Sequence, residues 1–367
     1  MDTHAEYWAR RAAEQTYDYM ERAEQVASDV ARLYRNASDW TAEQTGKVFA
    51  RFARKYGLTE KEAMKVLSNT RGRAELERIK AALALVHGDG ARELEMLLEA
   101  PAFRARIERL NDVMQQLDGI VERIYGQELN ASTELYRQIG KDAYYRGIYE
   151  IHKRSGIGVS FSHVSEKELD RVLHMKWSGE NYSQRIWDNT QELCDRVKEE
   201  ILLDVVMGKT NRESAKALER HFAKGAMQCR RLMRTESCFV AGELNARAYQ
   251  ETGVEKYRYV ATLDLITSQI CRSLDGKVFL LSERKAGTNY PPMHPWCRST
   301  TIAELPASVL ASMNRRGIDP ATGRPVLIPA TMNYTDWYEK YVKGKPEAEA
   351  KERAVKERLR KQNGNDG

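Results

Sequence analysis

The chain has 367 residues, a formal net charge of +6 and 31% charged residues. This length suits two or three domains with a real core, and so mild a charge does not by itself identify a nucleic-acid-binding protein. Five widely spaced cysteines do not make a disulfide framework and fit a reducing compartment. The N-terminus lacks an apolar signal-peptide core and no run approaches a membrane span, so we expect no membrane partner.

Helical periodicity dominates the first half of the chain. Residues 5–36 predict one helix, and Asp39 is a candidate N-cap for a second helix that ends at Gly57. Residues 59–88 predict further helices. These segments make residues 1–155 a predicted helical N-terminal domain.

Pro101 is suited to the first turn of the next helix, where a missing N–H does no harm. Apolar residues then recur at alternating steps of four and three, as in a heptad a/d pattern. They are Phe103, Ile107, Leu110, Met114, Leu117, Val121 and Ile124. Two interpretations stay open: a core-facing helix of a bundle, or a coiled-coil face that binds a partner.

The glycines at 156 and 158 make residues 153–162 the candidate linker to a second domain at 156–342. Ser165 has capping-box spacing, and helices are expected from Ser183 to Gly208 and from Asn211 to Phe222. A further helix at 226–252 carries arginines and glutamates. We expect a structural ion-pair network there, with an anion- or DNA-facing surface as the alternative.

Residues 257–301 change from helical to alternating periodicity. Tyr257, Tyr259 and Ala261 alternate with more polar positions, Asp275-Gly276 is a turn signal, and residues 278–281 predict the returning strand. The fold class is therefore mainly α with a small C-terminal β-hairpin-containing (α+β) domain, whose β unit spans 257–301.

Cys271, His294 and Cys297 are soft metal-ligand types within this β unit. The hairpin is able to return Cys271 to the His-x-x-Cys pair, with Asp264 or water as a fourth ligand and zinc as the candidate cofactor. A two-residue knuckle would need a cysteine where Ser268 stands. Two alternatives stay open: simple packing of these side chains, and a Cys271–His294 nucleophile pair oriented by Asp264.

After Thr301, prolines break up the chain, residues 319–323 predict a turn and residues 334–343 predict a short aromatic helix. Residues 343–367 form a charged segment that we expect to be mobile and to build no core. A solvated tail is the default, and a phosphate-binding arm is the alternative. The basic residues of this arm are Lys351, Arg353, Lys356, Arg358, Arg360 and Lys361.

Several motifs occur in order between Lys176 and Val342. They are Trp177-Ser178-Gly179, Ser183 and Arg185-Ile186-Trp187; Arg234-Thr235-Glu236 and Asn245; Ala261-Thr262-Leu263-Asp264, Thr267-Ser268 and Cys271; Leu274-Asp275-Gly276-Lys277; Pro291-Pro292-Met293-His294-Pro295 and Cys297-Arg298-Ser299; and Pro329-Ala330-Thr331-Met332-Asn333-Tyr334 with Trp337. This ordered set resembles the head morphogenesis domain of tailed phages, the Mu F-like minor head proteins.

The resemblance implies a minor capsid protein in few copies, associated with the portal and placed in the virion head after assembly in the bacterial cytoplasm. The N-terminal helices would contact the portal. Further partners would be the major capsid or scaffolding protein and, non-specifically, packaged DNA during packaging or ejection. Within the motifs, Arg234, Glu236, Asn245, Asp275, Gly276 and Arg298 would have structural roles.

No catalytic motif stands out, so we expect no enzyme. The alternative is an effector delivered with the genome, either a metal-dependent nuclease or an ADP-ribosyltransferase. A nuclease would need a carboxylate cluster that the sequence does not show. Glu347-Ala348-Glu349 matches the Glu-x-Glu of a transferase only in letters. Helix-turn-helix and zinc-finger spacings are absent, which argues against sequence-specific DNA binding.

Overall fold

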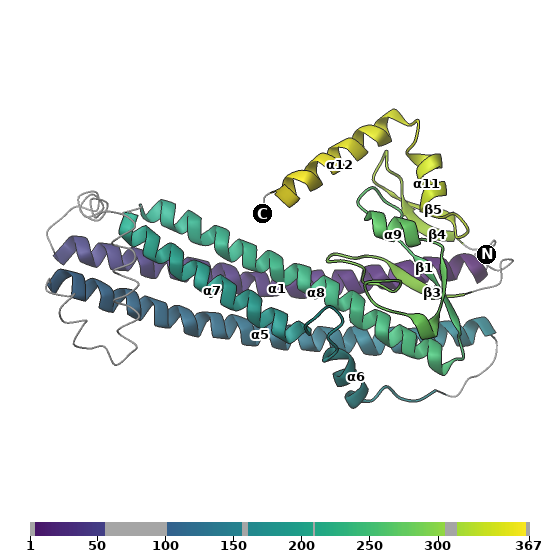
Figure 1. Ribbon diagram of the computed structural model, residues 1–367, viewed down its shortest axis with the longest axis horizontal. Helices are drawn as coiled ribbons and strands as arrows, with labels where there is room; N and C mark the ends of the chain where they lie inside the picture. The colour runs from purple at the N-terminus through teal and green to yellow at the C-terminus, as the bar shows by residue number, and fades with distance from the viewer. Residues whose placement is uncertain (1–3, 56–100, 156–160, 208–209, 305–313, 365–367) are drawn as a thin grey trace. The chain divides into compact units, whose positions relative to one another are not determined.

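The computed structural model describes residues 4–55, 101–155, 161–207, 210–304 and 314–364. Helices dominate these residues, and short antiparallel strands occur towards the C-terminal end (Figure 1). The predicted fold class, mainly α with a small β unit, is confirmed. The helices predicted within 59–88 and the glycines at 156 and 158 lie outside the described residues.

The chain divides into two compact units, and each is discontinuous in sequence. The first unit contains residues 1–25, 132–182 and 231–367, and the second contains residues 26–131 and 183–230. The domain boundaries predicted at 155 and 342 describe consecutive segments instead, and they stay a prediction.

Among the described residues, the second unit contains parts of four helices: α1 (His4–Lys55), α5 (Pro101–Ser155), α7 (Tyr182–Met207) and α8 (Asn211–Glu251). Figure 1 shows these parts side by side. The second helix expected at Asp39 is wrong, because α1 continues through that position. Thr41 and Thr45 bond to the carbonyls of Ala37 and Thr41, at 2.7 and 2.8 Å, so these hydroxyls do not cap a new helix.

Of the heptad residues of α5, those from Leu110 to Ile124 lie largely in a core, and the side chains of Phe103 and Ile107 lie outside the described part of the chain. Leu110 and Leu117 are fully buried, and Ile124 is 3% exposed. On neighbouring α1, the Tyr34 hydroxyl donates to the buried Glu128 carboxylate at 2.7 Å. The core-facing interpretation of this pattern is therefore the one that the structure supports.

In the first unit, α6 (Glu166–Leu173) begins at the predicted cap, where the Ser165 side chain accepts a hydrogen bond from the Glu168 N–H. The C-terminal half of α8 also belongs to this unit. Sequence patterns predicted two helices, at 211–222 and 226–252, but α8 runs unbroken through Gly225. A Cβ at that glycine would lie 2.7 Å from the Tyr34 ring, so close packing accounts for the glycine.

A three-stranded antiparallel sheet, in the order β2-β1-β3, packs against the end of α8. Its strands are β1 (Lys256–Val260), β2 (Val278–Leu280) and β3 (Thr300–Ala303). The predicted pairing of β1 with β2 is confirmed, with Tyr257 opposite Phe279. The expectation that a tight turn at Asp275-Gly276 joins these two strands directly is wrong, because α9 (Gln269–Leu274) lies between them. The short 3-10 helix η1 (Leu281–Glu283) follows β2.

A second, two-stranded sheet follows, with β4 (Asn314–Ile318) and β5 (Pro325–Pro329) joined by the turn predicted at 319–323. Sequence periodicity missed both strands. The predicted aromatic helix is α11 (Tyr334–Tyr341), and its Trp337 is fully buried.

The charged segment after Gly344 forms α12 (Pro346–Gly364). Ala348 is fully buried in a cluster with Trp337, and the Tyr338 hydroxyl donates to Glu352 at 3.0 Å. The expectation that this segment contributes nothing to a core is therefore wrong for its first turns. Its mobility stays a prediction. Among the described helices, none is both long and apolar enough for a bilayer span.

Candidate metal centre

Cys271 lies in the first turn of α9, whose N-cap is Ser268. The Ser268 side chain accepts a hydrogen bond from the Cys271 N–H, which fixes the start of the helix. The Cys271 thiol is buried, and the Tyr259 hydroxyl of β1 donates to its sulfur at 3.3 Å. The helix cap and the strand together position this sulfur.

A tight turn places His294 next to Cys297. The Cys297 N–H donates to the His294 carbonyl at 3.1 Å, Pro295 occupies the second position and Trp296 has a φ of 64°. Proline followed by a positive φ is the pattern of a type II turn. A tryptophan rarely adopts this conformation, and here its N–H donates to Thr235 while Arg234 stacks over its ring at 5.2 Å.

Three candidate ligand atoms converge on one point: the Cys271 and Cys297 sulfurs and a nitrogen of His294 all lie within 4.8 Å of one another. Cys271 Sγ is 3.4 Å from His294 Nε2 and 3.9 Å from Cys297 Sγ. Ser268 Oγ is 2.7 Å from the same His294 nitrogen. The structure thus brings together three of the four predicted ligands.

The electrostatics of the cluster disfavour a reactive thiolate. The pKa of Cys271 is raised to about 12, mainly by its hydrogen bond with Cys297 and by burial. The pKa of Cys297 is raised to about 11, and a hydrogen bond with Cys238 is the main cause. In the absence of a bound metal ion, these raised pKa values disfavour the thiolate that a cysteine nucleophile needs.

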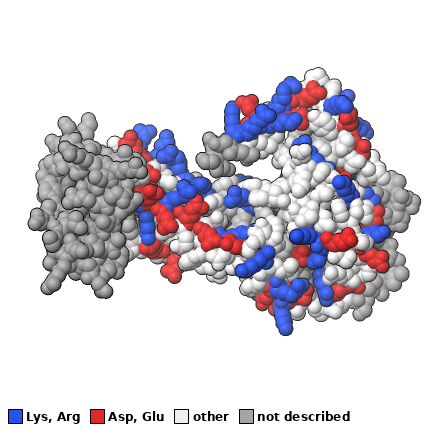
Figure 2. Space-filling view, viewed as in Figure 1, with Lys and Arg blue, Asp and Glu red and all other residues white. Residues whose placement is uncertain are grey.

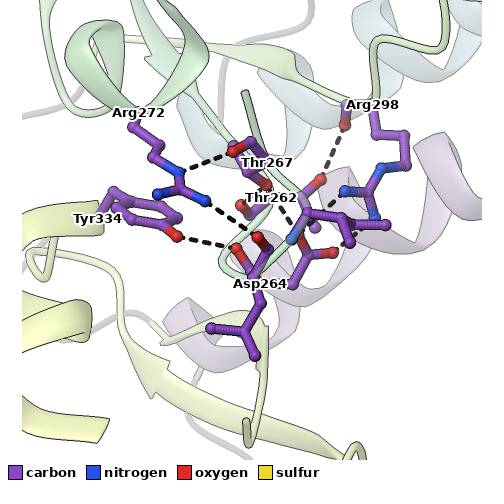
Figure 3. Close-up of polar contacts among 8 residues, drawn as sticks. Thr262, Asp264, Thr267, Arg272, Arg298 and Tyr334 are labelled. Carbon is purple, nitrogen blue, oxygen red and sulfur yellow. Dashed lines mark hydrogen bonds and ion pairs between the residues drawn. The ribbon is translucent and has the colours of Figure 1, made fainter. Parts of the chain in front are cut away.

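Asp264, the fourth predicted ligand, is engaged elsewhere. Its carboxylate receives two hydrogen bonds from Arg298, at 2.5 and 3.0 Å, and one from Thr267 at 2.9 Å (Figure 3). The Tyr334 hydroxyl donates to the Asp264 backbone carbonyl, and Arg272 donates to carbonyls of the same loop. Since Arg298 already neutralises this carboxylate, Asp264 is a structural anchor of the loop and lies outside the ligand cluster.

The arginine and glutamate of the Arg234-Thr235-Glu236 motif have separate partners, as their spacing predicts. Arg234 pairs with Glu24 at 2.6 Å, and the buried Glu236 accepts from the Trp177 indole at 3.2 Å. Asn245 donates to the Tyr249 hydroxyl at 3.0 Å. These contacts favour the structural interpretation of the motif over an anion-binding surface.

The Asp275-Gly276 turn makes hydrogen bonds to both sheets. Gly276 has a φ of 79°, which glycine adopts without strain, and its N–H donates to the backbone carbonyl of Tyr259 on β1. Asp275 accepts two hydrogen bonds from Arg315 of β4, each at 2.9 Å. Sequence patterns did not single out Arg315, because its partner is 40 residues away.

The six basic residues predicted to contact DNA lie on exposed positions of α12. Figure 2 shows Lys and Arg side chains gathered along this helix. Lys356 and Lys361 pair with Glu352 and Glu357 of the same helix, at 2.8 and 2.7 Å. DNA binding stays a prediction.

Sequence reasoning also missed Cys238 and a cavity. Cys238 lies on α8, where its thiol donates to the Ser299 carbonyl at 3.7 Å and contacts Cys297. A cavity of about 120 Å³ lies beside β1 and β4, with Arg258 and Arg316 in its lining. Sequence patterns did not single out Cys238, because its neighbours Cys297 and Ser299 lie about 60 residues further along the chain, and no pattern in the sequence indicates the cavity.

The fold and the site place this chain among helical proteins that carry a small β unit, and this β unit holds the cluster of Cys271, His294 and Cys297. Residues 195–302 match the family described as Phage Mu protein F like protein. This match confirms the resemblance to the Mu F-like phage head morphogenesis family. It covers the second half of α7, all of α8, β1, β2, most of β3 and the cluster.

The chain is also similar to a protein named NAD(+)--arginine ADP-ribosyltransferase EFV, from Enterococcus faecalis (strain ATCC 700802 / V583). The identity is 22% over 179 residues, which is 47% of this chain and 37% of that protein. This chain therefore matches little more than a third of that relative's length. No solved structure matches the chain.

Proposed function

We propose that this protein is a minor capsid protein, present in few copies, that associates with the portal and the capsid interior during head assembly in the bacterial cytoplasm. The match of residues 195–302 to the Mu F-like family carries this proposal. Contacts with the major capsid or scaffolding protein, and with packaged DNA during packaging or ejection, belong to the same proposal.

The internal charge pairs of the matched segment support an assembly role. Arg298 pairs with Asp264 at 2.5 Å, and Arg284 pairs with the largely buried Glu243 at 2.6 Å. Arg298 holds the loop that contains Asp264, and Arg284 fixes the β unit to Glu243 on α8. Groups committed to such pairs stabilise one conformation and are unsuited to proton transfer, so these pairs fit an interaction module.

The name of the E. faecalis relative favours a second candidate, an ADP-ribosyltransferase or another effector. Glu347 and Glu349 are the residues that match the Glu-x-Glu of such enzymes. They lie at the start of α12, and Glu349 accepts a hydrogen bond from the Gly344 N–H at 2.8 Å. A catalytic pair would be expected on a strand, so this placement supports the assembly role.

Purified particles of the phage that encodes this chain provide the test. We expect the protein in mature heads at a few copies per particle, and cross-linking should join it to the portal protein. Heads assembled without it should be fewer or less infectious. Its absence from particles would contradict the assembly role. Transfer of label from radioactive NAD⁺ to arginine-containing proteins by the purified chain would favour the transferase.

A further inference from the structure

The Cys–His–Cys cluster has the internal dimensions of a zinc site. Zinc–sulfur bonds of about 2.3 Å and zinc–nitrogen bonds of about 2.0 Å in a tetrahedron place two sulfurs about 3.8 Å apart and sulfur and nitrogen about 3.5 Å apart. Cys271 Sγ lies 3.9 Å from Cys297 Sγ and 3.4 Å from His294 Nε2. A single ion therefore fits between these atoms with little movement of the chain.

The histidine presents the correct nitrogen to the two sulfurs. His294 Nδ1 lies 2.7 Å from the Pro295 carbonyl oxygen, which only accepts hydrogen bonds. Nδ1 must therefore carry the hydrogen, and in the neutral ring Nε2 keeps its lone pair. Nε2 is the atom that faces Cys271 and Ser268. Zinc-bound histidines characteristically donate their second N–H to a carbonyl or carboxylate in this way.

Hydrogen-bond donors also surround the sulfurs. The Tyr259 hydroxyl donates to Cys271 Sγ at 3.3 Å, and the Met293 backbone hydrogen-bonds the Cys297 thiol. Such outer contacts stabilise thiolate ligands and fix their direction. The Ser268 hydroxyl already gives His294 Nε2 a hydrogen-bond partner. The histidine therefore does not need the two sulfurs as partners, and a shared metal ion accounts for all three atoms facing one point.

We propose that Cys271, His294 and Cys297 bind one zinc ion, with the fourth coordination position beside Ser268. The two thiolates and the imidazole suit zinc better than magnesium or calcium, which prefer oxygen ligands. The ion links α9 to the turn at 294–297 and so fixes a long connection between β1 and β3. Its role is structural, and the inference does not depend on the proposed assembly role.

Metal content of the full chain is the first measurement. The protein is unfolded with a chelator and a phosphine reductant, then refolded with or without zinc. We expect one zinc per chain after refolding with zinc, and a chelator should lower the melting temperature of this form. Cobalt(II) should give the strong visible and near-ultraviolet absorption of a tetrahedral thiolate site. A wild-type chain that binds neither metal and melts equally with and without chelator overturns the proposal, whatever the variants do.

Variants then define the ligands. Cys271→Ser, Cys297→Ser and His294→Ala should each weaken zinc binding by more than the roughly 10–100-fold that loss of an outer-shell partner costs. Cys238→Ser is the matched control, since this thiol contacts Cys297 but bonds to the Ser299 carbonyl. It should keep the metal and the cobalt spectrum. Loss of metal from Cys238→Ser, or its retention by Cys271→Ser and Cys297→Ser, would overturn the ligand set.

Ser268→Cys tests the fourth position. A cysteine there would complete a Cys₃His set of the kind found in closed structural sites. We expect this variant to hold zinc at least about tenfold more tightly in competition with a chromophoric chelator, because a protein ligand replaces a weak oxygen ligand. Equal or weaker binding would overturn the position beside Ser268. Far-ultraviolet circular dichroism should show unchanged helix content in every variant used.

Discussion

Arg315 and Asp275 form a buried, two-pronged ion pair between β4 and the turn that precedes β2. Both guanidinium Nη atoms lie 2.9 Å from a carboxylate oxygen, and the side chains are 8% and 0% exposed. Asp275 also accepts the Ala261 N–H at 2.7 Å. One carboxylate therefore connects the two sheets and the loop that leads to α9.

Removing the arginine should destabilise the protein strongly. In Arg315→Met the Asp275 charge stays buried without its partner, and breaking such a pair costs about 3–5 kcal/mol. Urea unfolding of both proteins measures this difference. Arg324→Met is the control, because this exposed arginine should change stability by less than about 0.5 kcal/mol. Equal stability of the two variants would show that the pair contributes nothing.

Glu128 should make stability depend on pH. Burial raises its pKa from 4.5 to about 7, and the neighbouring Tyr34 and Cys229 only partly offset this effect. The folded state therefore binds a proton more tightly than the unfolded state, so stability falls as pH rises from about 4.5 to about 7. The total loss is about 3 kcal/mol.

The variant Glu128→Gln isolates this effect, since the amide carbonyl can still accept from Tyr34. Near pH 5 the variant and the wild type should have similar unfolding free energies, and at pH 8 the variant should be more stable. Denaturant unfolding at several pH values checks this. A constant difference across the range would contradict the pKa assignment.

The heptad residues should behave as core. Leu117→Ala removes a fully buried side chain from α5 and should cost about 2–5 kcal/mol in the isolated protein. Gln116→Ala, at the adjacent exposed position, should be nearly neutral. If Leu117→Ala left the unfolding free energy unchanged but abolished incorporation into heads, the partner-face interpretation would hold instead.

The start of α12 should contribute to stability, and its end should not. A chain that ends at Gly344 loses the buried Ala348 and the Tyr338–Glu352 hydrogen bond, so its melting temperature should fall. A chain that ends at Glu357 keeps both contacts and should melt like the full protein. Equal melting of all three would restore the view of α12 as a solvated tail.

The arginines of α12 should contact phosphate without reading bases. Replacing Arg353, Arg358 and Arg360 by Gln should lower the salt slope of binding to random duplex DNA by about 3, because each phosphate contact contributes about 0.9. The control replaces three exposed basic residues of α8, Arg212, Lys216 and Arg220, by Gln. The same slope for both triple variants would assign any binding to net charge alone.

The sequence by itself determined the features that depend on neighbouring residues. Heptad spacing identified Leu110 and Leu117 as one face of α5, because helix periodicity brings such positions together. The Ser165 cap and the positive φ of Gly276 were also predictable, since both depend on a few adjacent residues. The residue types and short spacings were enough to suggest Cys271, His294 and Cys297 as a cluster.

Only the tertiary structure decided the contacts between distant segments. Asp264 and Cys271 both suit a metal by type, but Arg298 reaches Asp264 from 34 residues away and neutralises it. The pairing of Arg315 with Asp275 and the burial of Ala348 against Trp337 likewise arise from chain segments that periodicity treats separately. Local patterns report helix faces and turns, whereas the partner of a buried charge is set by which segments the fold brings together.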